Sequence, residues 1–120
     1  MNEMQMGAVE SRFADIIWQN EPISTTSLVK LAEAELNWKK TTTYTVLKRL
    51  CEKGIFANNG GSVTSLVSHD DFYARQSERF VDETFCGSLP AFIAAFTKRK
   101  ALSKTEVDEI RRMIDSFKEE

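Results

Sequence analysis

Hydroxyl, phenol and basic side chains share one side of a helix that the sequence predicts from Lys40 or Thr41 to Lys53. The other side has the apolar spacing of a buried stripe, formed by Thr43, Val46, Leu47 and Leu50. The polar side and its edges carry Lys39, Lys40, Thr41, Thr42, Tyr44, Thr45, Lys48 and Arg49. Threonine methyls suit thymine methyls, hydroxyls suit base edges or phosphates, and Lys and Arg reach guanine or the backbone. The pattern predicts a helix that reads the DNA major groove; the alternative is a solvated face without acids.

The distribution of charge favours this interpretation more than its total does. The formal net charge is −2 at pH 7, so the whole chain is close to neutral. Between Trp38 and Gly54, however, basic side chains are accompanied only by Glu52. A DNA-binding protein needs local positive charge rather than a high overall pI. The composition, with 42% hydrophobic and 28% charged residues, is that of a globular protein, and the length suits one domain or a small domain with an oligomerisation arm.

The predicted DNA-reading helix is the third of three short helices. A first amphipathic helix begins at Gly7 and ends before Pro22, and Ile23 is expected to form a short strand. Ser24 or Thr25 can cap a second helix that runs to Leu36, because these side chains accept hydrogen bonds from helix N-termini. A brief joint at Asn37 and Trp38 then precedes the third helix. Two helices joined in this way form a helix-turn-helix arrangement.

A hairpin is predicted directly after the third helix. Residues 55–56 are strand-like, residues 58–61 form an Asn-Asn-Gly-Gly turn, and residues 62–67 are expected to form a second strand. A hairpin that follows a recognition helix is the wing of a winged helix. The sequence therefore predicts a mostly α fold with a small β wing, in which residues 7–67 form a winged-helix DNA-binding domain.

Residues 68–120 are predicted to form a helical dimerisation domain. Helices are expected from Ser68 to Phe85, after Ser88, and after the capping box that begins at Ser103. Their large apolar side chains exceed what a short arm can bury against itself, and exposed apolar patches mark interfaces. The expected dimerisation residues are Phe72, Phe80, Phe85, Phe92, Phe96, Ile110, Ile114 and Phe117. The alternative is that the arm folds back onto its own winged domain in a monomer.

Other classes of site lack the residues they need. Cys51 and Cys86 are far apart, which indicates neither a disulfide framework nor a metal site, and His69 has the position of a solvent-facing residue. The sequence has no nucleophile with a base at useful spacing, no paired-carboxylate site and no Gly-rich phosphate loop. We therefore expect no enzyme activity, cofactor or metal. No secretory leader or membrane span is apparent, which favours a cytoplasmic protein without membrane insertion.

Several stretches, in this order and spacing, resemble the BlaI/MecI penicillinase-repressor family and its copper-responsive CopY relatives. They are MGAVESRFADIIW, TTTYTVLKRLCEKG after Trp38, VSHDDF, FVDETFCGSLPAFIAAF and ALSKTEVDEIRRMI. The resemblance covers about residues 7–118. It implies a homodimeric winged-helix repressor that sits on an inverted-repeat operator of double-stranded DNA until a signal displaces it. It also maps the recognition helix of the family onto residues 41–50.

The sequence departs from the family at several positions. Tyr44 stands where the family more often has a basic residue, and the wing segment ANNGGSVTSL is short and uncharged. Some members are cut in the arm at an Asn-Phe bond, which makes a membrane sensor protease a candidate partner, but the matching position is Ala95-Phe96. The copper-responsive relatives carry a cluster of cysteines near the C-terminus. No cysteine follows Cys86 here, so we expect no copper switch. The alternative to a repressor is a winged helix that binds proteins without specific DNA binding.

Overall fold

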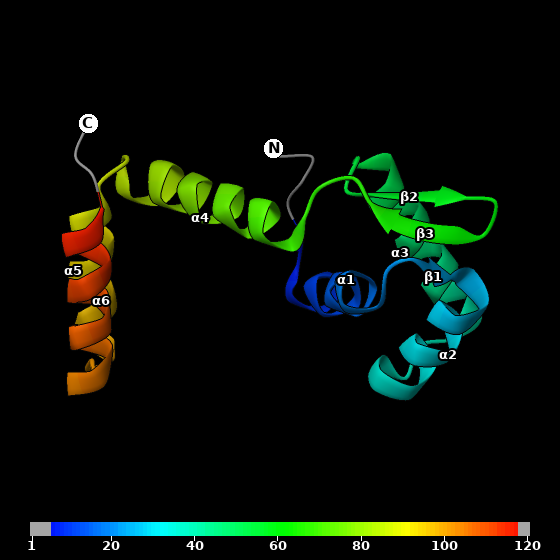
Figure 1. Cartoon of the computed structure of the whole chain (residues 1–120), viewed down its shortest axis with the longest axis horizontal. Helices are drawn as coiled ribbons and strands as arrows, with labels where there is room; N and C mark the ends of the chain where they lie inside the picture. The colour runs from blue at the N-terminus through cyan, green and yellow to red at the C-terminus, as the bar shows by residue number, and fades with distance from the viewer. Residues whose placement is uncertain (1–5, 118–120) are drawn as a thin grey trace. The chain divides into compact units, whose positions relative to one another are not determined.

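The computed structural model describes residues 6–117 and divides into two compact units, the first reaching to Ser77 and the second beginning at Glu78. Figure 1 shows the elements along the chain. They are α1 (Ala8–Asn20), β1 (Ile23–Ser24), α2 (Thr25–Leu36), α3 (Lys40–Glu52), β2 (Phe56–Asn59), β3 (Ser62–Ser65), α4 (His69–Phe85), α5 (Leu89–Arg99) and α6 (Lys104–Ser116). The mostly α fold with a small β wing is confirmed. The division between the units falls inside α4, whereas the sequence placed a boundary before it.

Local capping fixes the joint between α2 and α3. The Ser24 side chain accepts a hydrogen bond from the Ser27 N–H and so begins α2. Asn37 ends α2 in the left-handed conformation, with φ at 57°, which Asn tolerates better than most residues. The Trp38 N–H then donates to the Ala32 carbonyl, and α3 begins at Lys40. This short reversal confirms the predicted helix-turn-helix.

The wing belongs to a three-stranded antiparallel sheet in the order β1-β3-β2. Its turn is closed by a hydrogen bond of 2.9 Å from the Gly61 N–H to the Asn58 side chain, and Gly60 and Gly61 adopt the positive φ that the turn requires. At the other end of β3, the Glu21 carboxylate accepts hydrogen bonds from the N–H and the hydroxyl of Ser65. The strand bounds differ from the prediction: β2 runs from Phe56 to Asn59 and so includes part of the predicted turn, whereas β3 ends at Ser65, two residues before Val67.

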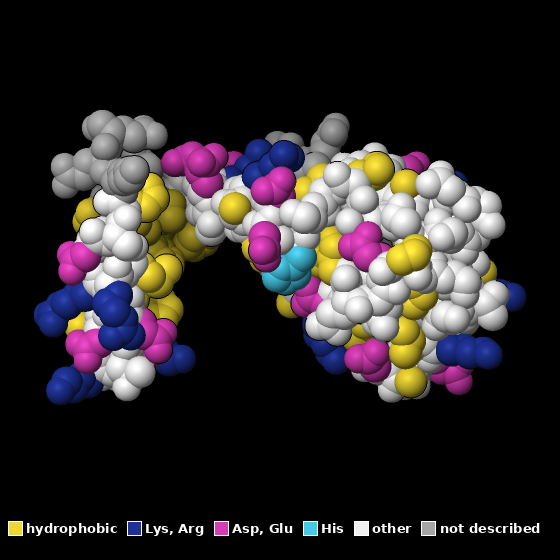
Figure 2. Space-filling model, in the orientation of Figure 1, with side chains coloured by type: hydrophobic (Ala, Val, Ile, Leu, Met, Phe, Trp, Pro, Cys, Tyr) yellow, Lys and Arg dark blue, Asp and Glu magenta, His cyan; other side chains and the backbone are white. Residues whose placement is uncertain are grey.

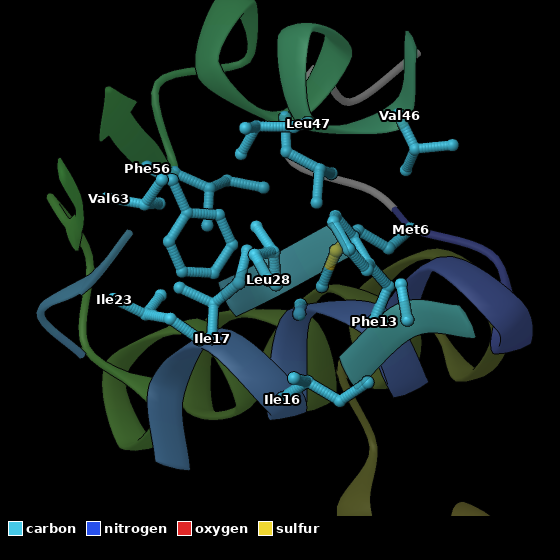
Figure 3. Close-up of a cluster of buried hydrophobic side chains, with 14 of the residues drawn as sticks. Met6, Phe13, Ile16, Ile17, Ile23, Leu28, Val46, Leu47, Phe56 and Val63 are labelled. Carbon is cyan, nitrogen blue, oxygen red and sulfur yellow. The ribbon is translucent and has the colours of Figure 1, made fainter. Parts of the chain in front are cut away.

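The core of the first unit joins α1, α2, α3 and the sheet. Phe13, Ile17, Leu28, Leu47 and Phe56 are buried, and Figure 3 shows their side chains packed in one cluster. The full buried cluster is Met6, Phe13, Ala14, Ile16, Ile17, Ile23, Leu28, Ala32, Val46, Leu47, Leu50, Ile55, Phe56, Val63 and Phe72. Burial of this apolar surface holds α3 against α1 and α2, and so fixes which side of α3 remains in solvent.

Phe72 corrects one of the dimerisation predictions. It is only 2% exposed and packs against Trp18 of α1, with 5.6 Å between the ring centroids. The Trp18 indole N–H also donates to the Val67 carbonyl at 3.0 Å, just before α4 begins. The first turns of α4 therefore complete the core of the first unit. Phe72 is not available to a partner subunit because its own protomer already covers it.

The second unit contains the end of α4 with α5 and α6. Phe92 of α5 lies at the centre of an aromatic cluster, with ring-centroid distances of 5.7 Å to Phe85, 6.0 Å to Phe80 and 6.1 Å to Phe96. None of its described residues, 78–117, is fully buried. Large apolar side chains remain exposed, namely Phe80, Leu89, Ile93, Phe96, Ile110, Met113, Ile114 and Phe117. Figure 2 shows such hydrophobic side chains on the surface of this unit.

Candidate nucleic-acid interface

Helix α3 separates an apolar side from a polar side as the sequence predicts. Thr43, Val46, Leu47 and Leu50 are buried against the core. The exposed residues are Lys39, Lys40, Thr41, Thr42, Tyr44, Thr45, Lys48 and Arg49. Tyr44 keeps 38% of its surface in solvent even though it is aromatic. The surface formed by these exposed residues is called the α3 face below. It joins hydroxyls, a phenol and cations on one rigid element.

The inward and outward threonines of α3 have different roles. Thr43 is 1% exposed, and its hydroxyl donates to the Lys39 carbonyl at 3.3 Å, which satisfies the buried oxygen. Thr45 is exposed, and its hydroxyl donates to the Thr41 carbonyl at 2.9 Å. Because that proton is used within the helix, the free lone pairs of Thr45 can accept from a base amine while its methyl remains available for an apolar contact.

The start of α3 is electropositive and held in place. Lys39 occupies the N-cap position, and no side chain caps the first N–H groups of the helix. The N-terminal end of the helix dipole is positive, as are the lysines at positions 39 and 40, so positive charge faces solvent at this end of α3. Trp38 anchors this end by packing on Phe13, with 5.0 Å between ring centroids. Such an end suits a phosphate of the DNA backbone.

Arg49 is placed differently from the other cations of the α3 face. Its Nη1 lies 3.5 Å from Oε2 of Glu10 on α1, and Lys53 Nζ lies 3.9 Å from the same oxygen. The sequence places Arg49 among the DNA-facing residues and gives no indication that Glu10 is its partner. The spacing along the chain gives no signal for this pair, because it depends on how α1 packs beside α3.

The wing offers backbone and amide groups instead of charge. Asn58, Asn59 and Gly60 at its tip are exposed, and no residue of the two strands and their turn, 56–65, is charged. Peptide N–H groups can bind phosphate oxygens without a cationic side chain. The wing therefore adds polar contacts at most, and the positive charge of the candidate interface comes from α3.

Outside the α3 face, Cys51 and His69 contact other parts of the first unit. Burial raises the pKa of the Cys51 thiol, although a hydrogen bond with the Asn58 backbone acts in the opposite direction. His69 lies 3.7 Å from Asp15 and stacks edge-on against Trp18, which joins α1 to the start of α4. Among the described residues, no group of three His, Cys, Asp or Glu could hold a metal ion. Over the same part of the chain, no helix is long and apolar enough to cross a membrane.

The comparisons with known proteins agree with this arrangement. A family profile described as penicillinase repressor matches residues 6–116, which include both compact units. The chain belongs to the penicillinase repressor family. The methicillin resistance regulatory protein MecI of Staphylococcus aureus strain Mu50 is 24% identical over 115 residues, covering 92% of this chain and 94% of that protein. MecI of strain N315 is 23% identical over the same shares.

Membership in this family establishes the general role of the protein. It is a winged-helix transcriptional regulator of the penicillinase-repressor type, in a family of DNA-binding proteins that are not enzymes. The expected resemblance is thereby confirmed.

Proposed function

We propose that this protein is a homodimeric repressor that binds an inverted-repeat DNA operator through α3. The observation that carries the proposal is the α3 face, which lies in solvent while the opposite side of the same helix is buried. Thr41, Thr42, Tyr44, Thr45 and Lys48 read base edges in the major groove. The lysines at positions 39 and 40 meet phosphates and fix the register of the helix on the duplex.

The arm supports dimerisation because it leaves apolar surface without cover. Phe117 and Ile114 are 76% and 61% exposed, and Ile110 on the same helix is 39% exposed. Phe80 and Phe96 of this unit are also exposed, and Phe85 and Phe92 are half-buried. A second copy of the arm covers this surface, and a closed two-fold dimer is the commonest such arrangement.

A two-fold dimer matches the symmetry of an inverted repeat. Two copies of α3 placed about 34 Å apart meet successive major grooves on one side of the duplex. Two protomers that make roughly 6–10 phosphate contacts give a binding constant that falls steeply with salt. Repression follows when the bound dimer occupies the DNA that a promoter needs.

A protein-binding role is the second candidate, because the wing lacks the charge with which a winged helix usually holds phosphate. In that role the α3 face would contact another protein.

A sensor protease that cuts between Ala95 and Phe96 would have to unwind α5, since both residues lie within that helix. We therefore base the proposal on DNA and a second copy of the chain.

The test compares two lysines of the α3 face. Lys48→Ala removes a contact with the bases, so it lowers affinity for the cognate duplex by about 1–3 kcal/mol and alters base preference. Lys40→Ala removes one phosphate contact from each protomer, so it weakens binding to all sequences alike and makes the salt slope of the dimer shallower by about 1.8. Binding curves are measured on a duplex from the promoter of the protein's own operon and on a scrambled duplex, each at several salt concentrations.

Lys30→Ala provides the matched control, because Lys30 is an exposed lysine on α2 outside the α3 face. It should leave both binding curves unchanged. If Lys48→Ala and Lys40→Ala bind as the wild type does, the α3 face does not contact DNA. If the wild type binds neither duplex at low salt and instead retains a protein partner, the protein-binding role is correct.

A further inference from the structure

Glu10 lies against two cations at the end of the recognition helix, Arg49 of the α3 face and Lys53, which follows the helix. Its Oε2 faces Arg49 Nη1 at 3.5 Å and Lys53 Nζ at 3.9 Å. Glu10 belongs to α1, so the pair connects the first helix of the winged domain with the recognition helix. Glu52, the acid of α3 itself, forms no ion pair with Arg49 among the contacts observed in residues 6–117.

The acid of this pair is held more firmly than the base. Glu10 Oε1 accepts a hydrogen bond of 3.4 Å from the Gly7 N–H, as a glutamate in the third position of a helix commonly does. The Glu10 side chain is 21% exposed, whereas that of Arg49 is 52% exposed. Glu10 therefore stays with its own helix end. Arg49 is the partner that can leave, because half of its side chain already lies in solvent, and a DNA phosphate can then take the place of the carboxylate.

We propose that Glu10 is a specificity residue that suppresses non-specific DNA binding by competing with phosphate for Arg49. This inference rests on the proposed binding of DNA by α3. Non-specific binding comes almost entirely from cations that meet phosphates and release counterions. An arginine that keeps its carboxylate releases no counterion from the duplex. Specific binding also uses base contacts from residues such as Thr45 and Lys48, which Glu10 does not touch.

The strength of the pair suits this role. Exposed ion pairs are weak, and a phosphate in fixed register can displace the carboxylate. In a specific complex the base contacts set that register, so a phosphate can be brought to Arg49. On random sequence no register is fixed, and the carboxylate competes with phosphates that arrive in many positions. Glu10 therefore reduces binding to random DNA more than binding to the operator, and raises the ratio of the two affinities.

The experiment is Glu10→Gln in the full-length protein. Glutamine has the same size and its amide oxygen can accept the same hydrogen bond from the Gly7 N–H, so α1 keeps its N-terminus while the charge is lost. Each released arginine adds about 0.9 to the salt slope of binding, so the dimer should gain about 1.8 on a scrambled duplex. Affinity for that duplex at low salt should rise on the order of tenfold, and affinity for the promoter duplex should rise less.

Two further variants separate the proposed role from simpler ones. Glu106→Gln removes the same charge from the same capping position of α6, where the glutamate accepts from the Ser103 N–H, and it should leave the salt slope unchanged. Glu10→Gln combined with Arg49→Gln should lose the added slope, because the released cation is gone. Thermal unfolding of each variant checks that all are folded at the assay temperature.

An unchanged salt slope in Glu10→Gln would overturn the inference. An increase that persists in the double variant would also overturn it, because the effect would then not pass through Arg49. A wild-type protein that binds no duplex at low salt refutes the proposed function itself, which keeps the two failures apart. The inference is supported if the slope rises with Glu10→Gln alone and if discrimination between the promoter and scrambled duplexes falls.

Discussion

Replacing Ile114 of α6 by alanine is expected to weaken the dimer without unfolding the protomer. Ile114 is 61% exposed in the single chain and lies beside Ile110, Met113 and Phe117 on the apolar side of α6. Little of its surface contributes to the stability of one protomer. Alanine is also a stronger helix former than isoleucine, so α6 should persist. The loss should therefore fall on association between copies.

The size of the effect follows from the exposed fraction. Fully burying an isoleucine side chain is worth about 1.5–3 kcal/mol. Because 61% of Ile114 remains to be buried, its share in the interface is about 1–2 kcal/mol for each protomer and about 2–4 kcal/mol for the pair. At about 1.4 kcal/mol for each factor of ten, the dimer dissociation constant should rise about 30- to 1,000-fold.

Sedimentation equilibrium over a range of protein concentrations measures this constant directly. The matched control is Arg112→Ala, since Arg112 is exposed on the opposite side of the same helix and should leave the constant unchanged. Circular dichroism confirms that both variants retain their helices. An Ile114→Ala protein that associates as tightly as the wild type would refute the assignment of this side of α6 to the interface. A wild-type protein that stays monomeric at every concentration would refute the dimer.

Two further predictions concern the first unit. Phe72→Ala should lower the free energy of unfolding, measured by chemical denaturation, by about 3–5 kcal/mol, because Phe72 lies in the core of its own protomer. It should leave the dimer dissociation constant of the folded protein unchanged. Weaker association with unchanged stability would contradict this placement. Burial raises the pKa of the Cys51 thiol, so near pH 8 an alkylating reagent should label Cys51 more slowly than the exposed Cys86, and the rate at Cys51 should increase as the pH is raised. Peptide mass spectrometry measures both rates, and equal labelling of the two thiols would show that Cys51 is not shielded.

Local patterns in the sequence were sufficient to predict the elements. The helical spacing of Val46, Leu47 and Leu50 predicts the buried side of α3, and the Asn-Asn-Gly-Gly run predicts the turn of the wing. Both depend on neighbours along the chain: the first on the repeat of the helix and the second on the freedom of glycine at positive φ. The exposure of the α3 face then follows, because the two sides of one helix cannot both be buried in so small a core.

Pairing between distant elements could not be predicted in the same way. Phe72 and Phe80 have the same residue type and lie on the same helix, yet Phe72 packs on Trp18 while Phe80 joins the cluster around Phe92. Only the packing of α4 distinguishes them. Arg49 likewise acquires its partner from α1, at a separation along the chain for which a helical pattern carries no information. Periodicity shows that a side chain is on an apolar or charged side, but not which element covers it.

The placement of Phe72 has a practical consequence for the modularity of this repressor. A winged-helix fragment cut at the end of the wing would lose the Phe72 ring that packs on Trp18 and would leave that side of the indole facing water. The natural seam lies at Ser77, where the compact unit ends within α4. A chimaera that exchanges the winged-helix unit between relatives should therefore include the first turns of α4, with the junction between the two sequences in the middle of that helix.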